Sequence, residues 1–350
     1  MKISEWIDSE SEKTSILDLT KKTYGDSEIS SPSYYDWLYR QNPQGKPIIF
    51  LAKDEEKNDS VIGMEPIVPM KLIIDQKIVT SYLSCNSIVH PDYRKKGIFS
   101  KLLSLISDKS LKNEISCVYS VPNERSFNAF IREGFTEIAK LPLLVKPLRF
   151  SKYFDEPLRS IIRPFDNIWK INSNSNIEPF TDRYNTDFDN LANKASKRVS
   201  IIQKRDKEFL QWRYANHPTR KYQTFVLRED SVLKGYIITR QTTINEKTIG
   251  VIVDFMVDEE IKDQRKRKDL VNVALENFWR NDISLAIATC RTGLLENKLL
   301  HEAGFHTVPK FLKPETLHFI VLSSDSANSS LIKLKEFNNW FFSFGDYDVF

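Results

Sequence analysis

The stretch SCNSIVHPDYRKKGIFSKLLSLISDKS, residues 84–110, has the pattern of a strand, a basic turn and a helix. Ile88-Val89 ends an apolar run, and Pro91-Asp92 marks a turn. From Ile98 onward, apolar residues recur at the three- and four-residue spacing of a helix face. Arg94-Lys95-Lys96-Gly97 stands directly before that helix. We therefore expect three cations and a glycine at the amino end of a helix.

The chemistry of this turn favours an anion. The first N–H groups of a helix have no partner within the helix, and the helix dipole adds partial positive charge there. Gly97 has no Cβ, so a ligand can approach its backbone closely. The turn therefore predicts a site for a phosphate or pyrophosphate. Spacing alone leaves an ordinary strand–turn–helix with a solvated basic turn equally open.

A second stretch downstream favours the ligand site. Residues 115–121 (ISCVYSV) have the composition of a buried strand, and Pro122-Asn123 follows them. A short helix comes next, with Phe127, Phe130 and Ile131 as its expected buried face. Gly134-Phe135 predicts its end, because a glycine followed by an apolar residue is typical of a helix C-cap.

Together the two stretches resemble the GNAT superfamily of acyl-CoA N-acyltransferases. Residues 94–99 match the family's motif A, Arg/Gln-x-x-Gly-x-Gly/Ala, except at the last position. Asn123 through Gly134-Phe135 matches motif B, and the resemblance covers residues 47–146. It implies the GNAT fold, an α/β fold with a mixed sheet. It also implies acetyl-CoA or another acyl-CoA as co-substrate and a small-molecule amine as acceptor.

The resemblance assigns the cofactor contacts residue by residue. It implies that the strand residues contact pantetheine, that the turn and helix start hold the pyrophosphate, and that an asparagine supports the cofactor. These residues are Ile88, Val89, Arg94, Lys95, Lys96, Gly97, Ile98, Phe99, Ser100 and Asn123. Phe99 stands where the family has Gly or Ala, and Lys95 and Lys96 are expected to compensate electrostatically.

Acyl transfer to an amine requires a base and often an acid. Family members often place a tyrosine in the motif B helix, where this chain has Phe130, and a glutamate in the strand before the turn, where it has none. Glu65, in an apolar run, is the predicted base, with a water-facing strand carboxylate as the alternative. Tyr119 is the predicted acid, with a core aromatic as the alternative.

The second half of the chain repeats the first. Trp37–Pro43 and Trp212–Pro218 share the pattern Trp-x-Tyr-x-x-x-Pro, and Gly134-Phe135 recurs as Gly304-Phe305 at nearly the same offset. We therefore expect a duplicated GNAT fold. The predicted divisions are a first domain over 1–149, a linker over 150–176 and a degenerate domain over 177–350. The second copy has no glycine between Gly250 and Gly293, so we expect it not to bind CoA.

The C-terminal run of residues 340–350 is unusually aromatic for a chain end. An exposed segment of this composition would be sticky, so we expect it to dock. Two interpretations are open. The run either closes the second domain as a strand or carries Asp346 and Asp348 into the acceptor cleft.

Composition excludes several functional classes. The 350 residues are 41% hydrophobic and 28% charged, with a net charge of +4, which indicates a globular chain and does not favour nucleic acid. Its N-terminus lacks the apolar stretch of a signal peptide, and no apolar run approaches the ~20 residues of a membrane span. We expect a cytoplasmic protein. The three cysteines are far apart and show no metal-ligand spacing.

The first functional hypothesis is therefore an N-acyltransferase, with acetyl as the expected acyl group. The tandem layout and aromatic tail resemble proteins of bacterial surface-polysaccharide pathways, which implies an amino sugar as acceptor. A non-catalytic acyl-CoA-binding or regulatory module and a FemX-like aminoacyl transferase remain as alternatives. The sequence makes no prediction of the oligomeric state.

Overall fold

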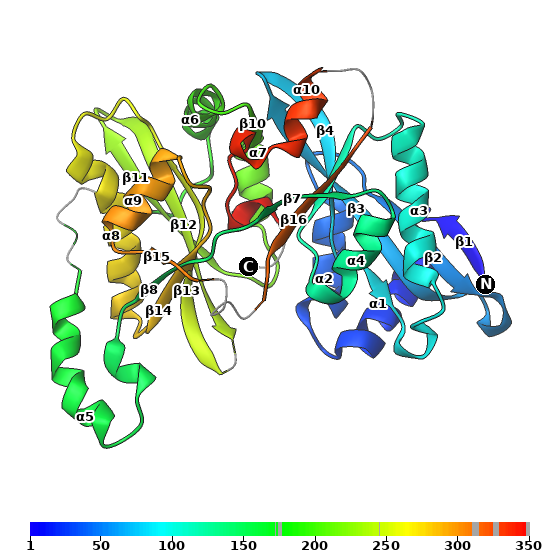
Figure 1. The fold of residues 1–350 in the computed structure, drawn as a ribbon, viewed down its shortest axis with the longest axis horizontal. Coiled ribbons are helices and arrows are strands. Elements are labelled where there is room, and N and C mark those ends of the chain that lie inside the picture. Colours follow the sequence, from blue (N-terminus) through cyan, green and yellow to red (C-terminus); the bar gives the residue numbers. More distant parts are fainter. Residues whose placement is uncertain (172, 174–176, 245, 310–314, 325–328, 348–350) are drawn as a thin grey trace.

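The computed structural model describes residues 1–171, 173, 177–244, 246–309, 315–324 and 329–347. These residues form two mixed sheets, one of nine strands and one of seven, with helices on their faces (Figure 1). Each sheet contains one parallel pair of strands, and the remaining pairs are antiparallel. This arrangement confirms the predicted α/β mixed-sheet fold and its duplication.

The first sheet has the order β1-β2-β3-β4-β6-β16-β7, and both β5 and β10 pair with β3. The strands from the first half are β1 (Lys2–Glu5), β2 (Ile48–Asp54), β3 (Ser60–Ile74), β4 (Lys77–Ser84), β5 (Ile88–Val89), β6 (Cys117–Ser120) and β7 (Thr136–Lys140). β3 is continuous over 15 residues, whereas residues 85–87 separate β4 from β5.

Helices cover both faces of this sheet. They are α1 (Glu10–Tyr24), α2 (Pro32–Tyr35), α3 (Ile98–Leu111) and α4 (Glu124–Arg132). Alternate residues of β2 face opposite sides: Phe50 belongs to the core with α3 and α4, and Leu51 to the core with α1 and α2. The expectation that Ile131 is buried in α4 is wrong. Its side chain is 38% exposed, whereas Phe130 on the same helix is buried.

The second sheet repeats this plan with the order β15-β8-β14-β13-β12-β11-β9. Its strands are β8 (Leu144–Pro147), β9 (Ile177–Phe180), β11 (Tyr222–Glu229), β12 (Val232–Ile244), β13 (Lys247–Val257), β14 (Leu285–Ala288) and β15 (His306–Thr307). Its helices are α6 (Thr186–Ser196), α7 (Lys207–Leu210), α8 (Gln264–Arg280) and α9 (Leu295–Glu302). The parallel pair β13–β14, followed by α9, corresponds to β4–β6, followed by α4.

The two halves exchange strands. β8 comes from the first half but pairs with β14 and β15 of the second sheet. In return, β16 (His318–Ser323) lies between β6 and β7 of the first sheet, and β10 (Ile201–Gln203) pairs with β3 (Figure 1). The sheets therefore do not divide at residue 149. The division of the chain into a first domain, a linker and a second domain describes the repeated sequence units and stays a prediction. The expected linker carries the helix α5 (Leu158–Ile162), which projects beyond the second sheet.

The two tryptophans that define the sequence repeat meet each other. Trp37 and Trp212 each lie in a five-residue π-helical turn, and their rings stack with centroids 4.7 Å apart. The indole Nε1 of Trp37 donates to the Trp212 carbonyl at 2.8 Å, and Trp212 Nε1 donates to the Trp37 carbonyl at 2.9 Å. Each tryptophan thus supplies the hydrogen-bond donor for the carbonyl of its counterpart in the other repeat, as expected across a local twofold axis.

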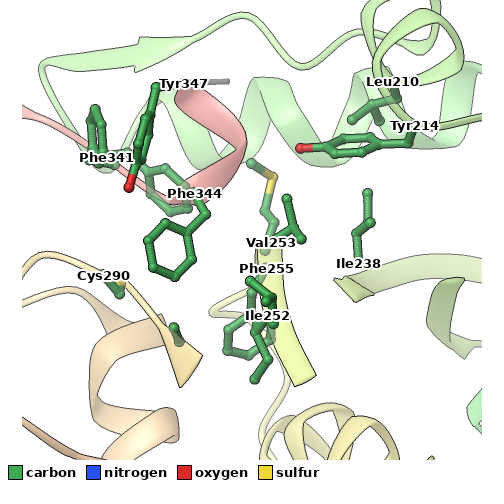
Figure 2. Close-up of a cluster of buried hydrophobic side chains, with 14 of the residues drawn as sticks. Leu210, Tyr214, Ile238, Ile252, Val253, Phe255, Cys290, Phe341, Phe344 and Tyr347 are labelled. Atoms are coloured by element: carbon green, nitrogen blue, oxygen red, sulfur yellow. The ribbon is translucent and has the colours of Figure 1, made fainter. Parts of the chain in front are cut away.

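The described part of the C-terminal run, residues 340–347, forms irregular backbone with a 3₁₀ turn at Phe344–Asp346 and pairs only through an isolated bridge between Trp340 and Ile201, so the interpretation of these residues as a closing strand is wrong. Figure 2 shows Phe341, Phe344 and Tyr347 of this tail packed over β13. Asp346 is buried and pairs with Arg205 at 2.8 Å. This carboxylate is therefore neutralised inside the protein rather than presented to an acceptor. Asp348 lies outside the described residues.

We expect Trp37→Phe to lower the free energy of unfolding by about 1–3 kcal/mol, because the buried carbonyl of Trp212 loses its donor. Trp212→Phe should cost a similar amount, and the double variant less than the sum of the two. Urea unfolding measures all three. Trp6→Phe, whose Nε1 donates at a partly exposed site, is the control and should cost less. Equal losses in all three single variants would contradict the central role of the pair.

Candidate functional site

A cavity of about 960 Å³ opens in the first half of the chain. Nearly all of the predicted cofactor residues line it, namely Ile88, Val89, Arg94, Lys95, Gly97, Ile98, Phe99, Ser100 and Asn123. Lys96 is not part of the lining, and its Nζ instead lies 4.7 Å from the centre of the Tyr93 ring. The fold thus gathers residues from the strand, the basic turn and the second motif around one open space.

The cavity lies where two parallel strands part. β4 and β6 pair only through Tyr82–Val118 and Leu83–Tyr119. Beyond that point β5 pairs with β3 instead, with Val89 opposite Gly63. Residues 84–87 on one side and 120–122 on the other line the cavity. The two segments no longer pair with each other through their backbones: the Ser84 carbonyl accepts from Ser120 Oγ at 2.9 Å, and the N–H of Cys85 donates to the Pro66 carbonyl at 3.4 Å.

The basic turn presents an uncapped helix end to this cavity. Gly97 adopts a left-handed conformation (φ 74°), and no side chain caps the first turn of α3. A Cβ at Gly97 would meet no atom within 4 Å, so the space beside the turn is open. Arg94 Nε lies 3.4 Å from the Val89 carbonyl, which holds this side chain against the strand. Free N–H groups, the helix dipole and the two lining cations Arg94 and Lys95 all favour an anion here.

The corresponding helix of the second half differs at its start. Asp263 caps α8, and its carboxylate accepts from the N–H of Arg265 at 2.9 Å. The gap where β13 and β14 part is filled by tail residues, including Phe341 and Ser343, which leave a cavity of only about 10 Å³. In the second half, the Asp263 carboxylate thus occupies the helix start and the tail occupies the strand opening, whereas both places are open in the first half.

The second motif supports the cavity through packing and capping. Asn123 begins α4, and its Oδ1 accepts from the N–H groups of Arg125 and Ser126 at 3.1 and 3.0 Å. Phe99 and Phe130 both line the cavity and pack edge to face, with ring centroids 5.5 Å apart. The phenylalanine that replaces the family's small residue is therefore accommodated by an aromatic partner on α4.

Glu65 lies directly behind the cavity wall, on β3. Its side chain is fully buried, and its Oε1 accepts a hydrogen bond from Ser84 Oγ at 2.6 Å. Burial raises the pKa of Glu65 to about 7, although hydrogen bonds from Ser84 and Ser87 lower it in part. Both serines line the cavity. The water-facing alternative for Glu65 is therefore wrong, and its carboxylate is one hydroxyl group away from the cavity.

The two serines were not among the predicted site residues. The sequence feature that could have indicated them is the polar stretch Ser84–Ser87 between two apolar segments, because it marks the point where β4 ends. Only the cross-strand register places Ser84 against Glu65, because β4 pairs with β3 through Ile67–Ser84.

Tyr119 takes a different position from the one expected of an acid. Its hydroxyl donates to the carbonyl of Asp346 at 3.1 Å, and its side chain is 1% exposed and not part of the cavity lining. Burial raises the pKa of Tyr119 well above its ordinary value. This geometry supports the core interpretation of Tyr119 and gives its proton no route to a ligand in the cavity.

We expect the stability of the wild type to fall, relative to Glu65→Gln, as the pH rises. Unfolded Glu65 titrates at its ordinary pKa of 4.5 and folded Glu65 at about 7, so the folded state holds an extra proton between these values. The resulting stabilisation is complete below pH 4.5 and is lost as the pH rises through 7. Between pH 5 and 8 the difference should change by about 2 kcal/mol.

Chemical unfolding at several pH values measures this change, with Glu178→Gln on the exposed surface of β9 as the control. Parallel stability curves for the wild type and Glu65→Gln would show that the carboxyl group does not titrate in this range.

No helix in the described part of the chain combines the length and apolar composition needed to cross a membrane. The His, Cys, Asp and Glu side chains of the same residues form no group that could hold a metal ion. Cys85, Cys117 and Cys290 are free thiols.

Comparisons with known proteins agree with this architecture. Residues 8–134 match the family model described as acetyltransferase (GNAT) domain. A search of curated protein sequences finds no match.

Among solved structures, the chain is similar to a GCN5-related N-acetyltransferase from Anabaena variabilis (TM-score 0.64, 14% identity, 93% of this chain and 73% of that one). It is also similar to N-myristoyltransferase from Saccharomyces cerevisiae with bound myristoyl-CoA (TM-score 0.61, 14% identity, 92% and 79%). A third similar structure is a tandem GNAT protein from the clavulanic acid biosynthesis pathway (TM-score 0.59, 14% identity, 92% and 98%).

The uncapped turn in the first half, the capped and filled counterpart in the second, and the matched family model lead to one assignment. Residues 8–134 match the GNAT acetyltransferase family model, and the chain as a whole has the duplicated fold of a tandem GNAT protein.

Proposed function

We propose that the protein is an acyl-CoA-dependent N-acyltransferase that uses the cavity of its first copy. The observation that carries this proposal is the combination of an uncapped basic helix end on the cavity with a buried carboxylate whose pKa is near 7, which Ser84 links to the same cavity. The first feature suits a pyrophosphate, and the second suits proton removal near neutral pH. The solved structure with bound myristoyl-CoA supports an acyl-CoA ligand for this fold.

The proposed binding mode follows the lining from the turn to the strand opening. The N–H groups of Ile98, Phe99 and Ser100, with Arg94 and Lys95, would hold the pyrophosphate. Lys96 would contribute only through its longer-range charge, because it lies outside the lining.

The arm of the ligand would then follow the strand to the opening. The backbone of Ile88 and Val89 would hydrogen-bond pantetheine, and the thioester would lie where β4 and β6 part. Asn123 has its Oδ1 committed to the helix cap, so its amide nitrogen is the group that would face the ligand.

The proposed chemistry is direct attack of an amine on the thioester carbon. A proton leaves the ammonium group for the Ser84 hydroxyl, which passes its own proton to Glu65. The amine nitrogen forms a bond to the acyl carbon and the carbon–sulfur bond breaks, while the second proton of the nitrogen passes through water to the departing CoA thiolate. No tyrosine lies at the cavity position of Phe130, and Tyr119 is committed to Asp346, so water would protonate the thiolate.

Acetyl is the proposed acyl group, and an amino sugar is the proposed acceptor, as the resemblance implies. A second function, acyl-CoA binding without turnover, is favoured because Phe130 stands where family members often place a tyrosine and because the Tyr119 hydroxyl is committed to Asp346. Turnover with a suitable amine separates the two functions.

Calorimetric titration of acetyl-CoA tests the binding site. We expect one site per chain and at least a ~tenfold weaker affinity for Gly97→Asp, because a carboxylate would then occupy the helix end as Asp263 does in the second copy. Gly293→Asp is the matched control, since Gly293 also has positive φ but does not line the cavity. An absence of binding in the wild type would refute the proposed function.

Release of free CoA thiol in the presence of amino sugars, polyamines and amino acids tests the chemistry. We expect Glu65→Gln to lower kcat about 100-fold or more with little change in acetyl-CoA affinity, because proton removal is lost while the binding turn stays intact. In the wild type, the rate should rise with pH through about 7 as Glu65 loses its proton. Binding of acetyl-CoA without thiol release for any amine would favour the binding module.

A further inference from the structure

One cavity residue comes from the second half of the chain. Among the described residues, the lining is drawn from residues 23–132 and from Tyr347 of the C-terminal tail. The preceding residue, Asp346, accepts a hydrogen bond through its carbonyl from Tyr119. Tyr119 forms the last pair with Leu83 before β4 and β6 part. The tail therefore reaches the strand opening from the sheet face opposite α3 and α4.

The position of Tyr347 is fixed by buried interactions. Arg213 Nη2 donates to its carbonyl at 2.8 Å, and the neighbouring Asp346 is tied to Arg205. Its ring stacks on Phe342, with centroids 5.8 Å apart and an interplanar angle of 27°. Tyr347 is 2% exposed, and Figure 2 shows it between Phe341 and Phe344. A ring held in this way is a rigid wall, because the close-packed surroundings leave it little room to move.

We propose that Tyr347 limits the length of the acyl group that the cavity accepts, so that the co-substrate carries a short acyl chain such as acetyl. This inference rests on the proposed function. A ligand that extends from the Gly97 turn along β5 delivers its thioester to the strand opening, and an acyl chain directed through that opening meets Tyr347. Longer chains would need the space of the ring, and overpacking a rigid wall opposes their binding.

The test compares acetyl-CoA with octanoyl-CoA by calorimetric titration of the wild type, Tyr347→Ala and Tyr347→Phe. The wild type should bind acetyl-CoA at least ~tenfold more tightly than octanoyl-CoA. In Tyr347→Ala this preference should shift at least ~tenfold towards octanoyl-CoA, with acetyl-CoA affinity nearly unchanged. Tyr347→Phe keeps the ring and should match the wild type. Tyr153→Ala is a second control, because Tyr153 is an exposed tyrosine outside the cavity lining, and it should keep the wild-type preference.

Three results would overturn the inference: an unchanged preference in Tyr347→Ala, a wild type that prefers octanoyl-CoA, or a Tyr347→Ala that folds but loses acetyl-CoA as well. If neither ligand binds the wild type, the proposed function itself fails, and this inference fails with it. Tyr347→Val keeps an apolar contact to Phe342 and replaces Tyr347→Ala if that variant does not fold. It should give a smaller shift in the same direction, and no shift would overturn the inference.

Discussion

The reciprocal pairing of Trp37 and Trp212 is the constraint on which the rest of the structure depends. Each indole donates to the backbone of the other repeat, and the stacked rings fix the two halves about a local twofold axis. Both groups are buried, so loss of either donor would leave a carbonyl without a partner in the core. The exchange of β8 and β16 between the sheets strengthens the same junction. The two copies therefore form one continuous core rather than two separate bodies.

The two copies differ at the start of corresponding helices, α3 in the first and α8 in the second. The first presents Gly97 and an uncapped turn, whereas Asp263 caps the second. A carboxylate that accepts from a terminal N–H takes the place an anionic ligand would need. The second copy has also filled its strand opening with the chain's own tail. Its contribution to the cavity of the first copy is the support of that tail and, through it, of Tyr347.

The buried charged groups are of two kinds: those paired with an opposite charge, and a carboxyl group that accepts hydrogen bonds from hydroxyl groups. Arg205 is paired with both Asp254 and Asp346, so burial of these charges is compensated by close partners. Among the described residues, no cation pairs with Glu65, and burial raises its pKa towards neutrality because the serine hydrogen bonds lower it only in part. A buried carboxyl group without a countercharge beside an open cavity is a typical arrangement for a general base.

The sequence by itself determined the fold, its duplication and most of the residues by which the basic turn lines the cavity. Those features depend on local order: a glycine after three cations, apolar residues at helical spacing, and two repeats of Trp-x-Tyr-x-x-x-Pro. Only the tertiary structure decided the strand exchange, the contact between Ser84 and Glu65, and the positions of Tyr119 and Tyr347. These depend on register between strands and on a tail that crosses from one half to the other. The reason is physical, since local propensity fixes elements, while pairing across distant segments is set by which buried groups can satisfy one another.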